Sequence, residues 1–335
     1  MQRISLAHGE GGELTHRLIQ DVFIRSFGHS EQTKFDSAIL DIPAQTIAVT
    51  TDSYVVKPLI FPGGNIGKLA VTGTVNDLAV SGAVPLVITA GFILEEGFPI
   101  KSLKEIVNTM AGEAEKAGVN IIAGDTKVVE KGSVDGLFIN TTGIGVMREQ
   151  HRLKPEMVKE GDSVIISGTI GDHGVAILSA RQELGLLTDV RSDCASLNHL
   201  IHELQGGVEG IRVMRDPTRG GLATTLVELC EVFHFTFEMD EASIPVRADV
   251  QGACDILGYE PLYLANEGKV VIIVDSKDEQ KVIDILKGHE AGRDASVIGH
   301  ITSCHVQTGK LLLRTAVGTT RRLTRLSGQL LPRIC

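Results

Sequence analysis

The segment Phe61-Pro62-Gly63-Gly64-Asn65-Ile66-Gly67-Lys68-Leu69 indicates how this chain folds, because a glycine turn leads directly into a helical pattern. The pattern predicts a helix over 66–80, and the apolar run 86–94 that follows predicts a strand. A turn, a helix and a strand in direct succession are typical of layered folds in which helices pack on a sheet.

The same alternation of strands and helices extends through both halves of the chain. Strands are predicted over 37–42, 46–51, 86–94, 119–123, 137–147, 163–167, 212–215, 269–274, 296–301 and 310–314. Helices are predicted over 66–80, 102–117, 174–184, 221–232, 246–257 and 279–287. The strand 119–123 is expected to be short and buried. A polar stretch containing Pro155 suggests a domain boundary, so we expect domains over 1–152 and 153–320 and a mobile tail over 321–335.

Composition excludes several classes of protein. Hydrophobic residues make up 43% of the 335 residues, which is enough for one or two cores and excludes global disorder. The net charge of -10 disfavours nucleic acid as a partner, since that binding needs a basic surface. No apolar run is long enough for a membrane span, and the N-terminus lacks the apolar core of a signal peptide. We therefore expect a soluble cytoplasmic protein.

The glycine turn at 63–68 looks at first like a phosphate-binding P-loop, but it lacks two of the required residues. Pro62 stands where the first glycine should be, and Leu69 replaces the Ser or Thr that binds magnesium. Two interpretations stay open: a turn that opens a helix, or an anion site at the helix N-terminus. The segment Arg219-Gly220-Gly221, which opens another predicted helix, leaves the same choice.

Acidic and amide side chains recur beside glycines or at the ends of predicted strands. They are Asp52, Asn76, Asp77, Asp125, Asp216, Asn266 and Glu267. Each of them alone would most simply be a turn former or a helix cap. Together they resemble a magnesium–nucleotide site, because Mg²⁺ prefers carboxylate and phosphate oxygens. Lys127 would then neutralise phosphate charge.

Five cysteines are widely spaced and form no C-x-x-C pair, so no zinc or iron–sulfur site is predicted. Their odd number favours a reducing compartment. Four of them are interpreted as inert core thiols: Cys194, Cys230, Cys254 and Cys304. Cys335 is the last residue, and an extended tail would let it reach an active site and a partner in turn. The alternative is an incidental end residue.

These segments together resemble the HypE family of nickel–iron hydrogenase maturation proteins. The likeness is carried by Ala7-His8-Gly9, Thr51-Asp52-Ser53-Tyr54, the glycine turn, Asn76-Asp77, Gly124-Asp125-Thr126-Lys127, Gly171-Asp172-His173-Gly174, Asp216-Pro217-Thr218-Arg219-Gly220-Gly221 and Ala265-Asn266-Glu267-Gly268-Lys269. The internal motifs are shared loosely with the wider aminoimidazole ribotide synthetase superfamily. The ending Pro332-Arg333-Ile334-Cys335 is what distinguishes the HypE family.

The resemblance implies an α+β fold with two domains of the aminoimidazole ribotide synthetase type. The N-terminal domain would form a β-barrel-like core in a homodimer, with the nucleotide near that interface. A carbamoyltransferase, HypF, would load a carbamoyl group onto Cys335. The chain would act as an ATP- and Mg²⁺-dependent carbamoyl dehydratase that converts this group to a thiocyanate, and a HypC–HypD complex would receive the cyanide.

The expected site residues fall into three groups. Nucleotide contacts are expected from Asp52, Gly63, Gly64, Asn65, Asn76, Asp77, Asp125, Asp216 and Arg219, with Asp52, Asp77 and Asp125 as magnesium ligands. Lys127 would stabilise the transferred phosphoryl group, and Glu267 is the candidate base. Asn266 and Arg333 would orient the tail, whereas His173 is a weaker candidate with a structural role as the alternative.

Two other functions compete with this interpretation. The first is a kinase-like or synthetase relative that acts on a free small molecule, for which the tail would be dispensable. The second is a noncatalytic scaffold, which would bind nucleotide and partner proteins without releasing ADP.

Overall fold

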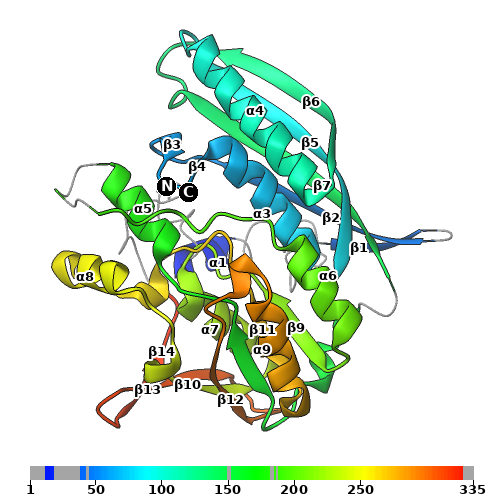
Figure 1. The fold of residues 1–335 in the computed structure, drawn as a ribbon, viewed down its shortest axis with the longest axis vertical. Helices are drawn as coiled ribbons and strands as arrows, with labels where there is room; N and C mark the ends of the chain where they lie inside the picture. Colours follow the sequence, from blue (N-terminus) through cyan, green and yellow to red (C-terminus); the bar gives the residue numbers. More distant parts are fainter. Residues whose placement is uncertain are drawn as a thin grey trace.

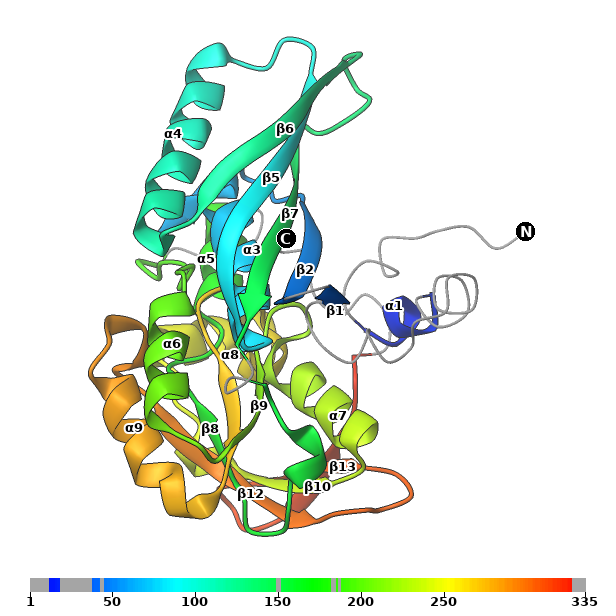
Figure 2. The same cartoon turned by 90° about the vertical axis from the view of Figure 1, so that its right-hand side faces the viewer.

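Two β-sheets, one from each half of the chain, organise the computed structural model and stack along its long axis (Figures 1 and 2). The structure describes residues 12–18, 38–42, 45–148, 152–181, 185 and 188–326. The first sheet has the order β1-β2-β7-β5-β6. Its strands are β1 (Ala38–Ile42), β2 (Gln45–Tyr54), β5 (Ala83–Glu95), β6 (Asn120–Val129) and β7 (Leu137–Met147).

One face of the first sheet is covered by α3 (Ile66–Val80) and α4 (Ile100–Ala117). Before α3, the short strands β3 (Ile60–Phe61) and β4 (Gly64–Asn65) form the glycine turn. Nearly every residue of α3 is buried, because this helix lies between the sheet and the second half of the chain. In contrast, α4 is buried along one side only, as its alternation of apolar and charged residues requires.

The second sheet has the order β14-β13-β10-β12-β8-β11-β9. Its strands are β8 (Ser163–Ile166), β9 (Ile211–Arg215), β10 (Thr236–Asp240), β11 (Val271–Val274), β12 (Ser296–Ser303), β13 (Lys310–Arg314) and β14 (Thr320–Leu323). The helices are α1 (Glu13–Leu18), α5 (Asp172–Ala180), α6 (Asn198–Gly207), α7 (Gly221–Phe233), α8 (Ala248–Leu257) and α9 (Glu279–Lys287). Five 3₁₀ turns complete the described part: Pro155–Met157, Glu241–Ser243, Pro261–Tyr263, Ser276–Asp278 and Glu290–Gly292.

One large hydrophobic cluster includes residues from both halves of the chain. Tyr54 and Ile66 from the first half lie in the same buried cluster as Val175 and Leu264 from the second. Burying this apolar surface stabilises the contact between the halves by the hydrophobic effect. As a result, the loops that leave both sheets meet at the junction, where the candidate site lies.

The predicted α+β two-domain fold is confirmed. Of the predicted elements, the helices 66–80 and 279–287 and the strands 137–147 and 310–314 have the bounds expected from the sequence. The sequence patterns did not predict α6 or β10.

Two predictions about individual segments are wrong. The strand expected over 119–123 as short and buried is the ten-residue edge strand β6, whose residues are almost all exposed. Residues 321–323, which were predicted to belong to the mobile tail, are part of β14, which pairs with β13 as far as Leu323, a residue that is only 3% exposed. Residues 327–335, including Cys335 and Arg333, lie outside the described residues. None of the helices within the described ranges has the length and hydropathy needed to cross a membrane.

Candidate active site

Four carboxylates from four separate segments form a cluster at the junction, which we call the acid cluster: Asp52, Asp193, Asp216 and Glu267. Asp52 comes from β2, Asp216 follows β9, and Glu267 precedes β11. Burial raises the pKa of Glu267 well above its ordinary value, and the charges of Asp193, Asp216 and Asp52 raise it further. The four groups are therefore close enough to sense one another electrostatically.

Arg215, Arg219 and Lys269 bring positive charge to the acid cluster. The Arg219 guanidinium opposes the effect of burial, which raises the pKa of both Asp52 and Glu267. Lys269 pairs with Asp193, with 3.5 Å between Nζ and Oδ2. Burial also raises the pKa of Asp216. A ligand that brings positive charge would stabilise such a concentration of partly desolvated acids.

Asp77 lies close to the acid cluster, on α3. Thr50 donates its hydroxyl to Asp77 Oδ2 at 2.7 Å, and Tyr54 donates to Asp52 Oδ2 at 3.2 Å. After burial, the charges of Asp52 and Asp77 are the largest effects that raise the pKa of Tyr54. Asp52 and Asp77 therefore both lie close enough to Tyr54 for their charges to act on its hydroxyl.

Asp125 and Lys127, in contrast, are not part of the acid cluster. In the strand register, Asp52 shares a row with Thr141 and Ala90, whose side chains are buried against the helices. Asp125 pairs with Gly91 in the neighbouring row, and neighbouring rows face opposite sides of a sheet. Asp125 and Lys127 therefore point to the open face, away from Asp52 of the same copy, and a magnesium site that combines Asp52, Asp77 and Asp125 stays a prediction.

A magnesium ion at this site would depend on a nucleotide for most of its ligands. Among the described residues, no group of three or more His, Cys, Asp or Glu side chains is arranged to hold a metal. Magnesium bound to a nucleotide needs only one or two carboxylates, since phosphates and water supply the other ligands. Asp52 and Asp77, beside an excess of buried acid, fit that requirement.

The glycine turn serves the fold directly. Asn65 caps α3, because its Oδ1 accepts the N–H groups of Gly67 and Lys68 at 2.9 and 3.0 Å. Gly63 has a φ of +98°, and a Cβ there would lie 2.7 Å from the carbonyl oxygen of Ser192. Gly64 completes the turn. These contacts favour a helix-opening turn over an anion site, and nucleotide contacts from this turn stay a prediction.

Two asparagines that were predicted as site residues, Asn76 and Asn266, form hydrogen bonds between separate segments of the chain. Asn76 accepts the N–H of Leu197 at 2.8 Å and donates to the carbonyl of Ala195 at 3.0 Å. Asn266 accepts the N–H of Gly171 at 2.8 Å and donates to the carbonyl of Pro217 at 2.9 Å. Both side chains are therefore committed within the chain, which supports a structural role for each.

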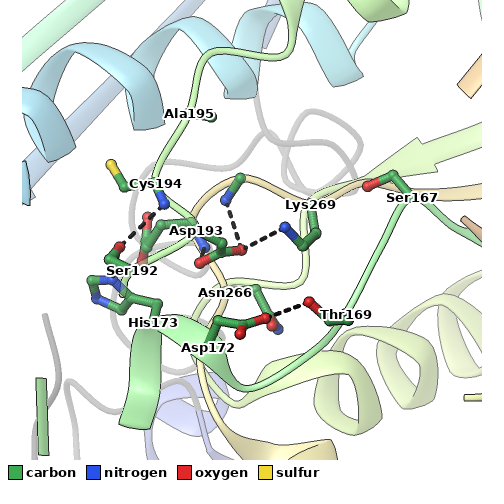
Figure 3. Close-up of polar contacts among 12 residues, drawn as sticks. Ser167, Thr169, Asp172, His173, Ser192, Asp193, Cys194, Ala195, Asn266 and Lys269 are labelled. Carbon is green, nitrogen blue, oxygen red and sulfur yellow. Dashed lines mark hydrogen bonds and ion pairs between the residues drawn. The ribbon is translucent and has the colours of Figure 1, made fainter. Parts of the chain in front are cut away.

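A loop that the sequence patterns missed lies at the centre of Figure 3: Ser192, Asp193 and Cys194. Ser192 Oγ lies 2.8 Å from Nδ1 of the fully buried His173, and burial lowers the pKa of this histidine to about 4. The His173 ring packs edge-on against Phe61 at 5.6 Å. These contacts support the structural interpretation of His173. No glycine or strand end flanks Asp193, so the pattern used for the other acids did not detect it.

Three of the four internal cysteines lie in the core as predicted, and Cys304 is less buried than predicted. Cys194, Cys230 and Cys254 are buried, whereas Cys304 is half-buried. Burial raises the pKa of Cys230 to about 12, so this thiol stays protonated and unreactive.

Comparison with known proteins identifies the family. The AIR synthase related protein family matches over residues 34–147 with its N-terminal domain and over 159–310 with its C-terminal domain. The chain is 46% identical over 337 residues to a carbamoyl dehydratase HypE of Rhodobacter capsulatus, covering 100% of this chain and 98% of the relative.

Two solved structures agree with this assignment. One is a HypE–HypF complex, which matches at 48% identity and a TM-score of 0.86, covering 92% of this chain and 99% of that one. The other is HypE in complex with ATP, at 44% identity and a TM-score of 0.83, covering 99% and 100%. The chain therefore belongs to the HypE family of AIR synthase related proteins.

Proposed function

We propose that this chain is an ATP-dependent carbamoyl dehydratase that acts in the maturation of nickel–iron hydrogenases, with its own Cys335 as the carrier of the reacting group. The observation that carries the proposal is the full-length similarity to proteins named carbamoyl dehydratase HypE, together with the ATP complex of one relative. The acid cluster supports it, because it places partly desolvated carboxylates beside a candidate magnesium pair, Asp52 and Asp77.

The reaction removes water from an S-carbamoyl group. An amide oxygen is a poor leaving group. It therefore attacks the γ-phosphorus of ATP, the bond from that phosphorus to ADP breaks, and the phosphorylated oxygen becomes a better leaving group. The C–O bond then breaks, phosphate leaves with that oxygen, and the nitrogen gives up its two protons over the sequence as the C≡N bond forms. The product is a thiocyanate on Cys335, which supplies cyanide.

Glu267 is proposed to accept a proton from the carbamoyl nitrogen. A carboxylate whose pKa is raised by burial and by neighbouring acids is a stronger base than an exposed one once it is ionised. Arg219 would neutralise negative charge that develops beside it. A magnesium ion held by Asp52 and Asp77 would neutralise phosphate charge.

A homodimer is proposed through the exposed edge strand β6 of the first sheet. The edge strand β6 exposes Ile122 at 61% and Val128 at 62%. An uncovered edge strand with apolar side chains is prone to pair with another chain. Pairing through this sheet would bury these residues and bring Asp125 and Lys127 of one copy toward its partner. HypF as carbamoyl donor, the HypC–HypD complex as cyanide acceptor, and the cytoplasm as location are proposed from the family.

The test is intact-protein mass spectrometry after incubation with HypF, carbamoyl phosphate and ATP. The chain should first gain the mass of one carbamoyl group and then lose that of one water. Cys335→Ala should abolish both species, whereas Glu267→Gln should accumulate the carbamoylated form, with dehydration slowed about a thousandfold. Modification of an internal cysteine would contradict the carrier role of Cys335.

A variant truncated after residue 326 separates this function from a kinase acting on a free small molecule. Such a kinase would keep its turnover of ATP without the tail, whereas the dehydratase would lose its substrate. Nucleotide binding without ADP release by the carbamoylated chain would instead indicate a scaffold.

A further inference from the structure

Asp193 holds the backbone of the loop that carries Glu267. Its Oδ1 accepts the N–H of Glu267 at 3.1 Å, and its Oδ2 accepts the N–H of Gly268 at 3.2 Å. The same carboxylate pairs with Lys269 and is only 3% exposed (Figure 3). One buried side chain therefore binds three consecutive residues, and two of these contacts are charge-assisted hydrogen bonds from adjacent backbone N–H groups.

The two loops also meet through their backbones. Ala195 donates its N–H to the carbonyl of Glu267 at 3.5 Å, and Asn76 donates to that carbonyl at 3.4 Å. A Cβ on Gly268 would lie 2.0 Å from the carbonyl oxygen of Asp193, so only glycine permits this approach. Glu267 is thus held at its N–H and its carbonyl, while its side chain stays available for chemistry.

Charged and titratable groups face Glu267 from every element around it. Asp193 comes from the preceding loop, Asp216 and Arg219 from the segment after β9, and Asp52 from β2, where the hydroxyl of Tyr54 also lies. Asp193 is the largest charge effect on Glu267 after burial. Lys269, bound to Asp193, balances the charge of this nearest acid.

We propose that Asp193 is a positioning residue, which holds Glu267 in place for proton abstraction, and that its ion pair with Lys269 sets the pH range in which Glu267 works. The inference rests on the proposed role of Glu267 as the base. In this role Asp193 acts through the backbone of Glu267 and Gly268 and not through contact with the substrate.

The test measures the dehydration rate of pre-carbamoylated protein against pH. Asp193→Asn removes a negative charge, so the acidic limb of the kcat profile should move to lower pH by about one unit. Asn accepts only one of the two N–H bonds, so kcat should also fall about tenfold to hundredfold, with the KM for ATP little changed. Lys269→Met leaves the charge of Asp193 unbalanced, so its acidic limb should move to higher pH. Lys269→Arg keeps the charge and should restore the original limb.

Opposite shifts in the two variants distinguish this role from simple loss of structure, which would move both profiles in the same way or neither. Thermal melting and ATP binding check that each variant is folded, and the two lysine variants carry the test if Asp193→Asn does not fold. If the acidic limb of the kcat profile stays at the same pH in the folded variants while Glu267→Gln is inactive, the inference is overturned and the proposed function stands. An active Glu267→Gln would overturn the role of the base and this inference with it, whereas Cys335→Ala tests the dehydratase function separately.

Discussion

The acid cluster and the edge strand β6 carry the same kind of sequence, yet the fold uses them differently. Asp52 and Asp216 lie where segments from both sheets meet, and their charges interact across the junction. Asp125 and Lys127 lie on an exposed strand at the rim of the first sheet (Figure 2). An acid beside a glycine therefore signals a candidate site, but the sheet register decides which site it can join.

Burial is what separates the two regions chemically. Water stabilises an exposed carboxylate, whereas burial has removed much of that solvation from Asp52, Asp216 and Glu267 and raises the pKa of each. In the edge strand β6, by contrast, apolar side chains and an unpaired backbone edge are exposed to solvent. These differences underlie the two proposals, a charged ligand at the acid cluster and a second copy of the chain at β6.

The largest effect is expected from filling the close approach between the loops of the acid cluster. Gly268→Ala places a Cβ against the carbonyl of Asp193, so the free energy of unfolding should fall by about 3 kcal/mol or more. Gly112→Ala is the matched control on α4, where nothing lies within 4 Å. It should raise stability by about 0.5–1 kcal/mol in chemical denaturation. Equal effects of the two changes would show that the loops are not in tight contact.

The second effect is on the stability of the folded protein at low pH, which depends on the buried His173 next to the Ser192 loop. Burial depresses the pKa of His173 from 6.5 to about 4, so the folded state resists its protonation. Neutral His173 therefore contributes about 3 kcal/mol to the free energy of unfolding above pH 6.5, and this contribution is lost as the pH falls toward 4. His173→Gln should lose this part of the pH dependence of unfolding, whereas the exposed His199→Gln serves as the control. An unchanged pH slope in His173→Gln would contradict the assignment.

The smallest effect tests the edge strand. Lys127→Ala should lower the dehydration rate about a hundredfold, with unchanged melting, whereas Lys131→Ala in the following turn should not. If Lys127 of one copy serves the site of its partner, mixing Lys127→Ala protein with Glu267→Gln protein should restore activity, because one site in each mixed dimer is complete. A mixture as inactive as its components would place both residues in the same copy or remove Lys127 from the reaction.

How far the sequence predicts the structure depends on how local the signal is. The helix 66–80 and the strand 137–147 were predictable because their apolar patterns and flanking turns are contained in the segments themselves. The prediction of a short, buried strand over 119–123 was wrong, since an apolar run such as Val119-Asn120-Ile121-Ile122-Ala123 does not reveal whether a neighbouring element covers it. Asp193 was missed for the same reason, because its partners lie about 75 residues away.

The sequence by itself determined the family, the α+β class and most of the candidate residues, because motifs and periodicity are properties of short segments. Only the tertiary structure decided which of those residues share a site. It joined Asp52 to Asp216 and Glu267, separated Asp125 and Lys127 from them, and introduced Asp193. The physical reason is that strand register, burial and loop contacts depend on residues far apart in the chain, and these set the charge and the solvation of each carboxylate.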